Sequence, residues 1–115
     1  MAHLLHITER TNWEAALRTG WYRTSTRGVS VDEQGFIHCS LPHQPRTVAE
    51  YLYGDVEDLV VLVIDSERLG APVVYEALEP GAEKYPHIYG PVPTSAVSDV
   101  VPVAHDDNGR MLLPE

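Results

Sequence analysis

The sequence contains a single cysteine, Cys39, and lacks any apolar run long enough to cross a membrane. One cysteine cannot form an internal disulfide, which fits a reducing compartment. The longest apolar run, Leu59 to Ile64, is the size of a strand and far short of the ~18 residues of a membrane span. The N-terminus also lacks the basic start and long apolar segment of a signal peptide, so we predict a cytoplasmic protein with no membrane contact.

Basic residues are scarce as well. The chain has 8 Lys and Arg against 17 Asp and Glu, a formal net charge of −9, and the basic residues form no cluster. Non-specific nucleic-acid binding and binding to anionic membranes both depend on such clusters, so neither is expected. A small ligand is the expected partner, and the sequence leaves the oligomeric state open.

The composition is that of an ordinary globular protein. The 115 residues are 43% hydrophobic and 22% charged, with no internal repeat, linker or low-complexity segment. This length is typical of one domain with one sizeable core. We therefore predict a single domain over residues 1–115, which ends in a turn and tail over 104–115.

Periodicity and turn residues predict the elements. A strand is expected over Leu4 to Thr8, and a helix from Asn12 to Thr19 that buries Trp13, Ala16 and Leu17. Thr11 and Glu14 would form its capping box and Gly20 would end it. The polar stretch from Tyr22 to Gln34 is interpreted as a loop that can contain short extended pieces.

The second part of the chain is richer in strands. Further strands are expected over 35–40, 59–64, 73–78 and 97–104, a helix from Pro45 to Tyr53, and an irregular proline-rich segment over 81–93. A turn over 107–109 would fold 111–113 back beside the last strand. This order predicts an α+β fold with an antiparallel or split sheet and two main helices.

Several polar side chains interrupt strands that are otherwise suited to burial. His38 and Ser40 share one strand face and need partners or a cleft, and His6 on the first strand presents the same choice. Glu76 lies between Val74 and Leu78 on one face, which favours a buried carboxylate with a functional role. In each case a purely structural role is the alternative.

Other candidates are a rigid loop, a metal site and a nucleophile. His87 and Tyr89 lie in a proline-bounded segment suited to ligand recognition, although Tyr89 alone fits packing as well. The six histidines are dispersed, and His38 and Cys39 point to opposite strand faces, so no metal is expected. Cys39 shares its face with Ile37 and is interpreted as a small core residue rather than a nucleophile.

Five stretches together resemble the uncharacterised bacterial family known as domain of unknown function 952. They are Leu5-His6-Ile7-Thr8, Trp13-x-x-Ala16 with Gly20-x-Tyr22, Gly35 to Ser40, Leu59 to Asp65, and Pro86 to Pro91. The resemblance covers roughly residues 4 to 103. The phrases around His38 and His87 are the most distinctive.

The layout is also distantly similar to the ADP-ribosyltransferase superfamily, which implies a split antiparallel sheet holding NAD or an ADP-ribose-like group in a cleft. Its first motif matches His6 with Thr8, and its second matches His38 with Ser40. Glu76 matches the third motif by residue type. The resemblance thus implies NAD as cofactor and His6, His38 and Glu76 as catalytic residues.

The same resemblance implies the ligand contacts. Ser40, His87 and Tyr89 would line the pocket with Thr8. Arg23, with Arg10, Arg27 and backbone amides, would supply counter-charge for a pyrophosphate. The expected function is binding of NAD or a related nucleotide in a histidine-lined cleft, with ADP-ribose transfer or hydrolysis as its enzymatic form. The alternatives are a non-catalytic module that binds a small ligand and, more weakly, a histidine-based metal site.

Overall fold

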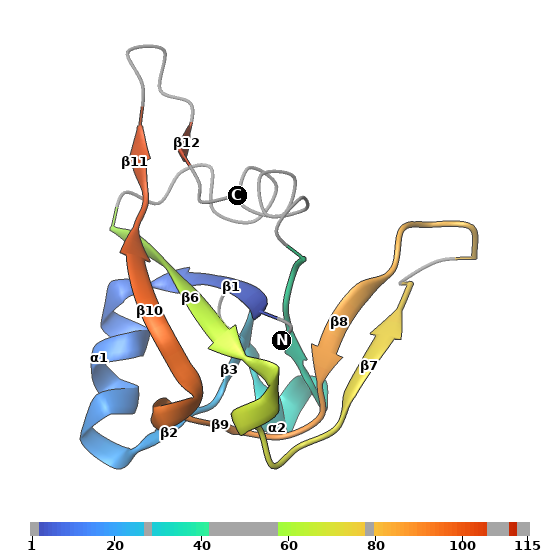
Figure 1. Ribbon diagram of the computed structural model, residues 1–115, viewed down its shortest axis with the longest axis horizontal. Helices are drawn as coiled ribbons and strands as arrows, with labels where there is room; N and C mark the ends of the chain where they lie inside the picture. Colours follow the sequence, from blue (N-terminus) through green and yellow to red (C-terminus); the bar gives the residue numbers. More distant parts are fainter. Residues whose placement is uncertain (1–2, 27–28, 42–57, 78–79, 106–110, 113–115) are drawn as a thin grey trace.

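Two three-stranded antiparallel sheets form the centre of the computed structural model (Figure 1). The structure describes residues 3–26, 29–41, 58–77, 80–105 and 111–112. The first sheet has the order β1-β6-β10, and its strands are His3–Glu9, Leu59–Asp65 and Val97–Pro102. The second has the order β5-β8-β7, with strands Ile37–His38, Tyr85–Ile88 and Val73–Glu76.

Among the described residues, a single backbone bridge joins these two sheets. Leu5 of β1 and Ser40, just beyond β5, exchange two N–H···O bonds of 2.7 Å each. Elsewhere in the described chain no backbone pair connects β1 with β5. The expected α+β class with antiparallel sheets and two helices is confirmed, and the sheets separate from this bridge onward.

Strand β6 is the most buried element of the fold. It pairs with β1 and β10, and its side chains are buried on both faces, as the uninterrupted apolar run predicts. Leu4, Tyr22, Leu62 and Ile88 belong to the larger core cluster, which includes residues of both sheets. A smaller cluster around Leu5, Ile7, Leu59, Val61 and Val103 covers the other face of the first sheet.

Helix α1 (Arg10–Thr19) follows β1 without a loop, so the predicted capping box at Thr11 is wrong. Glu9 is the N-cap and makes no side-chain cap bond. The helix start is held instead by Arg10, whose N–H donates to the Asp58 carbonyl at 3.0 Å while its side chain binds the Asp58 carboxylate at 2.9 Å. The predicted end is confirmed, because Gly20 adopts φ 84° there.

The contact face of α1 is narrower than predicted. Ala16 is buried and Trp13 packs against the larger core cluster, but Leu17 is 57% exposed. The predicted burial of Leu17 is therefore wrong. Figure 1 shows α1 (blue) at the side of the first sheet that is remote from β7 and β8.

The stretch over residues 22–34 contains the short extended pieces expected of it, together with a short helix that was not predicted. It contains β2 (Trp21–Tyr22), β3 (Thr24–Thr26), β4 (Val29–Ser30) and the short helix α2 (Val31–Gln34). Strand β2 pairs with β9 (Val92–Pro93), and β3 pairs with β4. Ser30 and Glu33 form the capping box of α2, a signal present in the sequence that we did not interpret.

The segment expected to be irregular contains β8, the central strand of the second sheet, so that prediction is wrong. Pro86 is tolerated because its carbonyl accepts the Cys39 N–H at 2.9 Å, which shows that its backbone polar groups face β5. Its missing N–H therefore lies on that side, and the ladder to β7 loses no donor.

The remaining predictions fall near the end of the chain or outside the described residues. The strand expected over 97–104 is confirmed as β10, and β11 (Ala104–His105) pairs with β12 (Met111–Leu112) as expected. The helix expected over 45–53 and the turn over 107–109 lie outside the described residues. Within the described part of the chain, no helix has the length and apolar character needed to span a bilayer.

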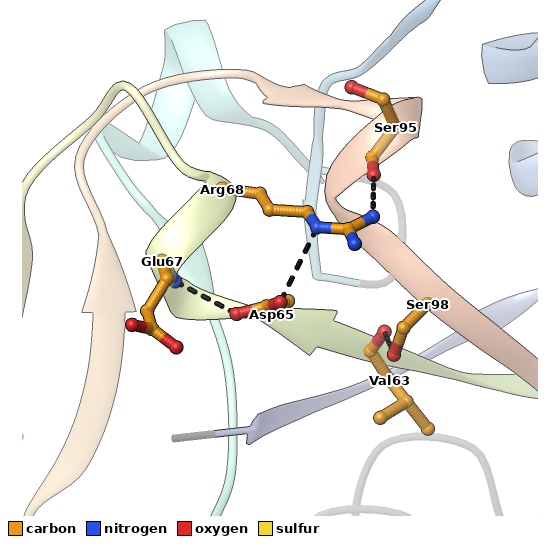
Figure 2. A network of polar contacts seen from close by, with 6 residues as sticks. All are labelled: Val63, Asp65, Glu67, Arg68, Ser95 and Ser98. Carbon is orange, nitrogen blue, oxygen red and sulfur yellow. Dashed lines mark hydrogen bonds and ion pairs between the residues drawn. The ribbon is translucent and has the colours of Figure 1, made fainter. Parts of the chain in front are cut away.

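A polar network fixes the end of β6 against the start of β10 (Figure 2). Asp65 caps the short helix η1 (Ser66–Arg68) by accepting the Glu67 N–H at 3.0 Å and lies 3.5 Å from the Arg68 guanidinium. Arg68 reaches the Ser95 carbonyl in η2 (Thr94–Ala96). These contacts set the direction in which the chain leaves β6 toward β7.

We predict that truncating Leu62 destabilises the whole domain. Its side chain is fully buried in β6, so Leu62→Ala should lower the free energy of unfolding by about 3 kcal/mol. Leu17→Ala, at an exposed position, is the matched control and should change it by less than about 1 kcal/mol. Urea denaturation followed by circular dichroism measures both, and equal losses would contradict the described core.

Candidate functional site

The backbone register of the second sheet places His38 beside His87. His38 of β5 is the partner of His87 in β8, and His87 is the partner of Val74 in β7. Because Cys39 and Pro86 are joined through their backbones, the neighbouring His38–His87 pair is a non-hydrogen-bonded pair, in which side chains lie closest. Ile37 and Ile88 alternate with them and enter the core.

His87 connects this pair to a carboxylate. Its Nδ1 lies 2.9 Å from Glu76 Oε1, and the Tyr89 hydroxyl donates to the same oxygen. Phe36 stacks on the His87 ring with 4.0 Å between centroids and 15° between planes. The His87 side chain is only 2% exposed, so its orientation is fixed by contacts on several sides.

His38 completes the arrangement. Its Nδ1 lies 3.3 Å from His87 Nε2, and its ring is tilted against Tyr85 with centroids 5.2 Å apart. The residue is half-buried. We call His38, His87 and Glu76 the histidine–carboxylate row, since they follow one another across the outer face of the second sheet.

His6 lies beneath this row, at the point where the sheets separate. Its Nδ1 is 2.6 Å from the His38 carbonyl and its Nε2 is 2.7 Å from the Tyr22 hydroxyl. A carbonyl only accepts, so Nδ1 carries the hydrogen, and in the neutral ring Tyr22 donates to Nε2. His6 is 2% exposed and both its nitrogens have protein partners, so its ring supports His38 rather than meeting a ligand directly.

The electrostatics favour neutral rings at His6 and His38 and a charged Glu76 carboxylate. Burial lowers the pKa of His6 from 6.5 to about 4. Burial and, secondarily, the nearby His87 lower the pKa of His38 from 6.5 to about 4. Hydrogen bonds from Tyr89 and His87 lower the pKa of Glu76, and the same bond to Glu76 raises the pKa of Tyr89.

Three further predicted ligand-binding residues form no hydrogen bond with the row in the described part of the chain. Thr8 is buried and its hydroxyl accepts from Asn12 at 3.2 Å. Ser40 is buried and its backbone forms the bridge to Leu5. Arg23 is exposed, and its carbonyl accepts the Val31 N–H at 2.7 Å. Their roles in binding stay predictions.

Two local interpretations of the row need correction. Glu76 is not buried, because β7 is the edge of its sheet and this face is open: its side chain is 38% exposed and Val74 is 42% exposed. His87 lies in a central strand and not in a loop. Phe36 and Tyr85 were missed, although each lies two residues before a histidine of the row and therefore on the same strand face.

Neither a metal site nor a cysteine nucleophile is supported by the geometry. Across the ranges that the structure describes, no three His, Cys, Asp or Glu side chains gather in a way that would hold a metal ion. Cys39 is 1% exposed and packs in the larger core cluster, and burial raises the pKa of its thiol. The predicted structural role of Cys39 is confirmed.

These features define an α+β domain in which two antiparallel sheets are joined by one bridge in the described chain. The second sheet carries the histidine–carboxylate row. A sequence model of the family described as "Protein of unknown function (DUF952)" matches residues 7–100. The chain belongs to this family, as the resemblance predicted.

Solved structures share the fold. A crystal structure of protein CC0527 from Caulobacter crescentus is 29% identical, with a TM-score of 0.82 over 96% of this chain and 94% of that chain. A solution NMR structure of CC0527 is 32% identical, with a TM-score of 0.74 over 95% of this chain and 90% of that chain. No curated protein matches the sequence.

We predict that acid destabilises the domain through His6. Its folded pKa of about 4 lies below the ordinary 6.5, so between these values the unfolded chain binds more protons and the free energy of unfolding falls as pH falls. The effect of this buried ring is on the order of 3 kcal/mol. Urea denaturation at pH 7 and pH 4.5 measures it.

His6→Asn keeps a donor near Nδ1 but cannot be protonated in this range, so its stability should change less between the two pH values. His3→Asn, at an exposed position, is the control and should behave as the unmodified protein does. An unchanged pH dependence in His6→Asn would contradict the assignment of a buried neutral imidazole.

Proposed function

We propose that the protein binds NAD or a related ADP-ribose-containing nucleotide at the histidine–carboxylate row and cleaves its nicotinamide–ribose bond there. The observation that carries this proposal is the convergence of His38, His87 and Glu76 on one face of the second sheet, where the Glu76 side chain is exposed. The distant similarity to the ADP-ribosyltransferase superfamily supplies the ligand class, and the divergence of two antiparallel sheets agrees with it.

The row offers acceptors and ring surfaces to such a ligand. Among the described residues, His38 Nε2 and Glu76 Oε2 have no hydrogen-bond partner, so both are available to ribose hydroxyls or to water. Tyr85 and Tyr89 present aromatic rings beside them. A nucleoside carries both features, hydroxyl donors and a planar base.

Cleavage by water would use His38 as general base. The bond between the ribose C1′ and the nicotinamide nitrogen breaks, and its electron pair neutralises the pyridinium ring. Water adds to C1′ and gives its proton to His38 Nε2, which later releases it to solvent. Glu76 stabilises the oxocarbenium character that develops on the ribose, as carboxylates do in glycoside cleavage. The products are nicotinamide, ADP-ribose and one proton.

The second candidate is a module that binds the nucleotide without turnover. Glu76 Oε1 already accepts from His87 and Tyr89, an arrangement that holds the carboxylate in place and favours recognition over chemistry. The net charge of −9 also disfavours tight binding of a pyrophosphate. Both candidates place the ligand at the same residues.

The decisive assay follows nicotinamide release from NAD, with ADP-ribose binding measured by calorimetry alongside. His38→Gln lacks the basic nitrogen, so we expect release to fall by about 100-fold or more. His3→Gln, an exposed histidine outside the row, should keep full activity. Circular dichroism of both variants serves as the check that they fold.

The outcomes separate the candidates. Release that depends on His38 supports the enzyme, and ADP-ribose binding that depends on His38 without release supports the module. Equal release or equal binding by the unmodified protein and His38→Gln would place any activity elsewhere. Absence of both binding and release in the unmodified protein would overturn the nucleotide proposal.

A further inference from the structure

The positions of the ring hydrogens in the histidine–carboxylate row can be assigned by starting from the Glu76 carboxylate. An ionised carboxylate only accepts, so His87 donates from Nδ1 to Glu76 Oε1 across 2.9 Å. In the neutral ring the other nitrogen, Nε2, is then an acceptor. It faces His38 Nδ1 at 3.3 Å, and an N–H must lie between two nitrogens that form a hydrogen bond.

This hydrogen belongs to His38. With a neutral His87 ring, Nε2 carries no hydrogen, so His38 Nδ1 is the donor of the pair. A neutral imidazole has one N–H, which leaves His38 Nε2 with a lone pair. The pKa of His38, lowered to about 4 by burial and by His87, agrees with a neutral ring near pH 7.

The backbone sets the order in which His38, His87 and Glu76 follow one another. Sheet register sets His38 opposite His87, and Glu76 lies two residues along β7 from the partner of His87. The stacked ring of Phe36 and the near-complete burial of His87 prevent the imidazole from turning over. Tyr89 donates to Glu76 from the other side and keeps the carboxylate an acceptor.

We infer that a neutral His87 is a positioning residue that, oriented by Glu76, holds His38 as the Nδ1–H tautomer and leaves its Nε2 as an acceptor. This deepens the proposed function, on which only the identity of the ligand rests. The group that meets Nε2 must then be a donor: a hydroxyl, a water molecule or an amide N–H. A carbonyl or an unprotonated phosphate oxygen is disfavoured at this position.

The test is the tautomer of His38 in the free protein, which needs no ligand. Long-range proton–nitrogen correlation spectra of ¹⁵N-histidine-labelled protein at pH 7 distinguish a protonated ring nitrogen from an unprotonated one. We expect His38 to be protonated at Nδ1 and unprotonated at Nε2, and His87 to be protonated at Nδ1.

Glu76→Leu removes the acceptor that orients His87 without touching His38. We expect His87 to lose its single tautomer and His38 to shift toward protonation at Nε2. His87→Leu should produce the same shift in His38 by removing its acceptor. Glu14→Leu, an exposed glutamate on α1, is the matched control and should leave both rings unchanged.

The Glu76 variant carries the test even if His87→Leu does not fold, because Glu76 lies on the open edge strand. Protonation of His38 at Nε2 in the unmodified protein would overturn the inference. So would a His38 tautomer that stays the same in a folded Glu76→Leu variant. If the expected tautomers are found in a protein that neither binds ADP-ribose nor releases nicotinamide, the positioning role of His87 stands and only the proposed nucleotide ligand is refuted.

Discussion

The arrangement depends on one hydrogen bond, from the His6 ring to the main-chain carbonyl of His38 across 2.6 Å. It lies next to the Leu5–Ser40 bridge, where backbone pairing between the sheets ends. The imidazole supplies a donor that the diverging backbone of β1 no longer offers to this carbonyl. Tyr22 fixes the other ring nitrogen, so the position of His38 is tied to the buried core.

From His6 to Glu76, the exposure of the side chains increases across the second sheet. His6 is enclosed and structural, His38 is half-buried, and Glu76 lies on the open edge strand. Burial of the first two keeps their rings neutral, and two donors keep the carboxylate ionised. Such a gradient from a rigid interior to an accessible acceptor is how proteins prepare side chains for binding and proton transfer.

The alternation of side chains between the two faces of a strand predicted much of the site from sequence. It placed His38 opposite in direction to Ile37, made Cys39 a core residue and marked Glu76 as a carboxylate in need of partners. It could not reveal the pairing of His38 with His87, because a register between strands 49 residues apart depends on tertiary packing. Pro86 concealed the central strand, since local rules disfavour proline there and cannot see that its N–H side is spared.

The most direct test of the account is a crystal structure of the protein soaked with ADP-ribose. We expect a ribose hydroxyl, or a water molecule that it holds, within hydrogen-bond distance of His38 Nε2, with Glu76 facing the same sugar. The His38–His87 contact should persist in that complex. Nucleotide bound at another surface, with only solvent over the histidine–carboxylate row, would contradict it.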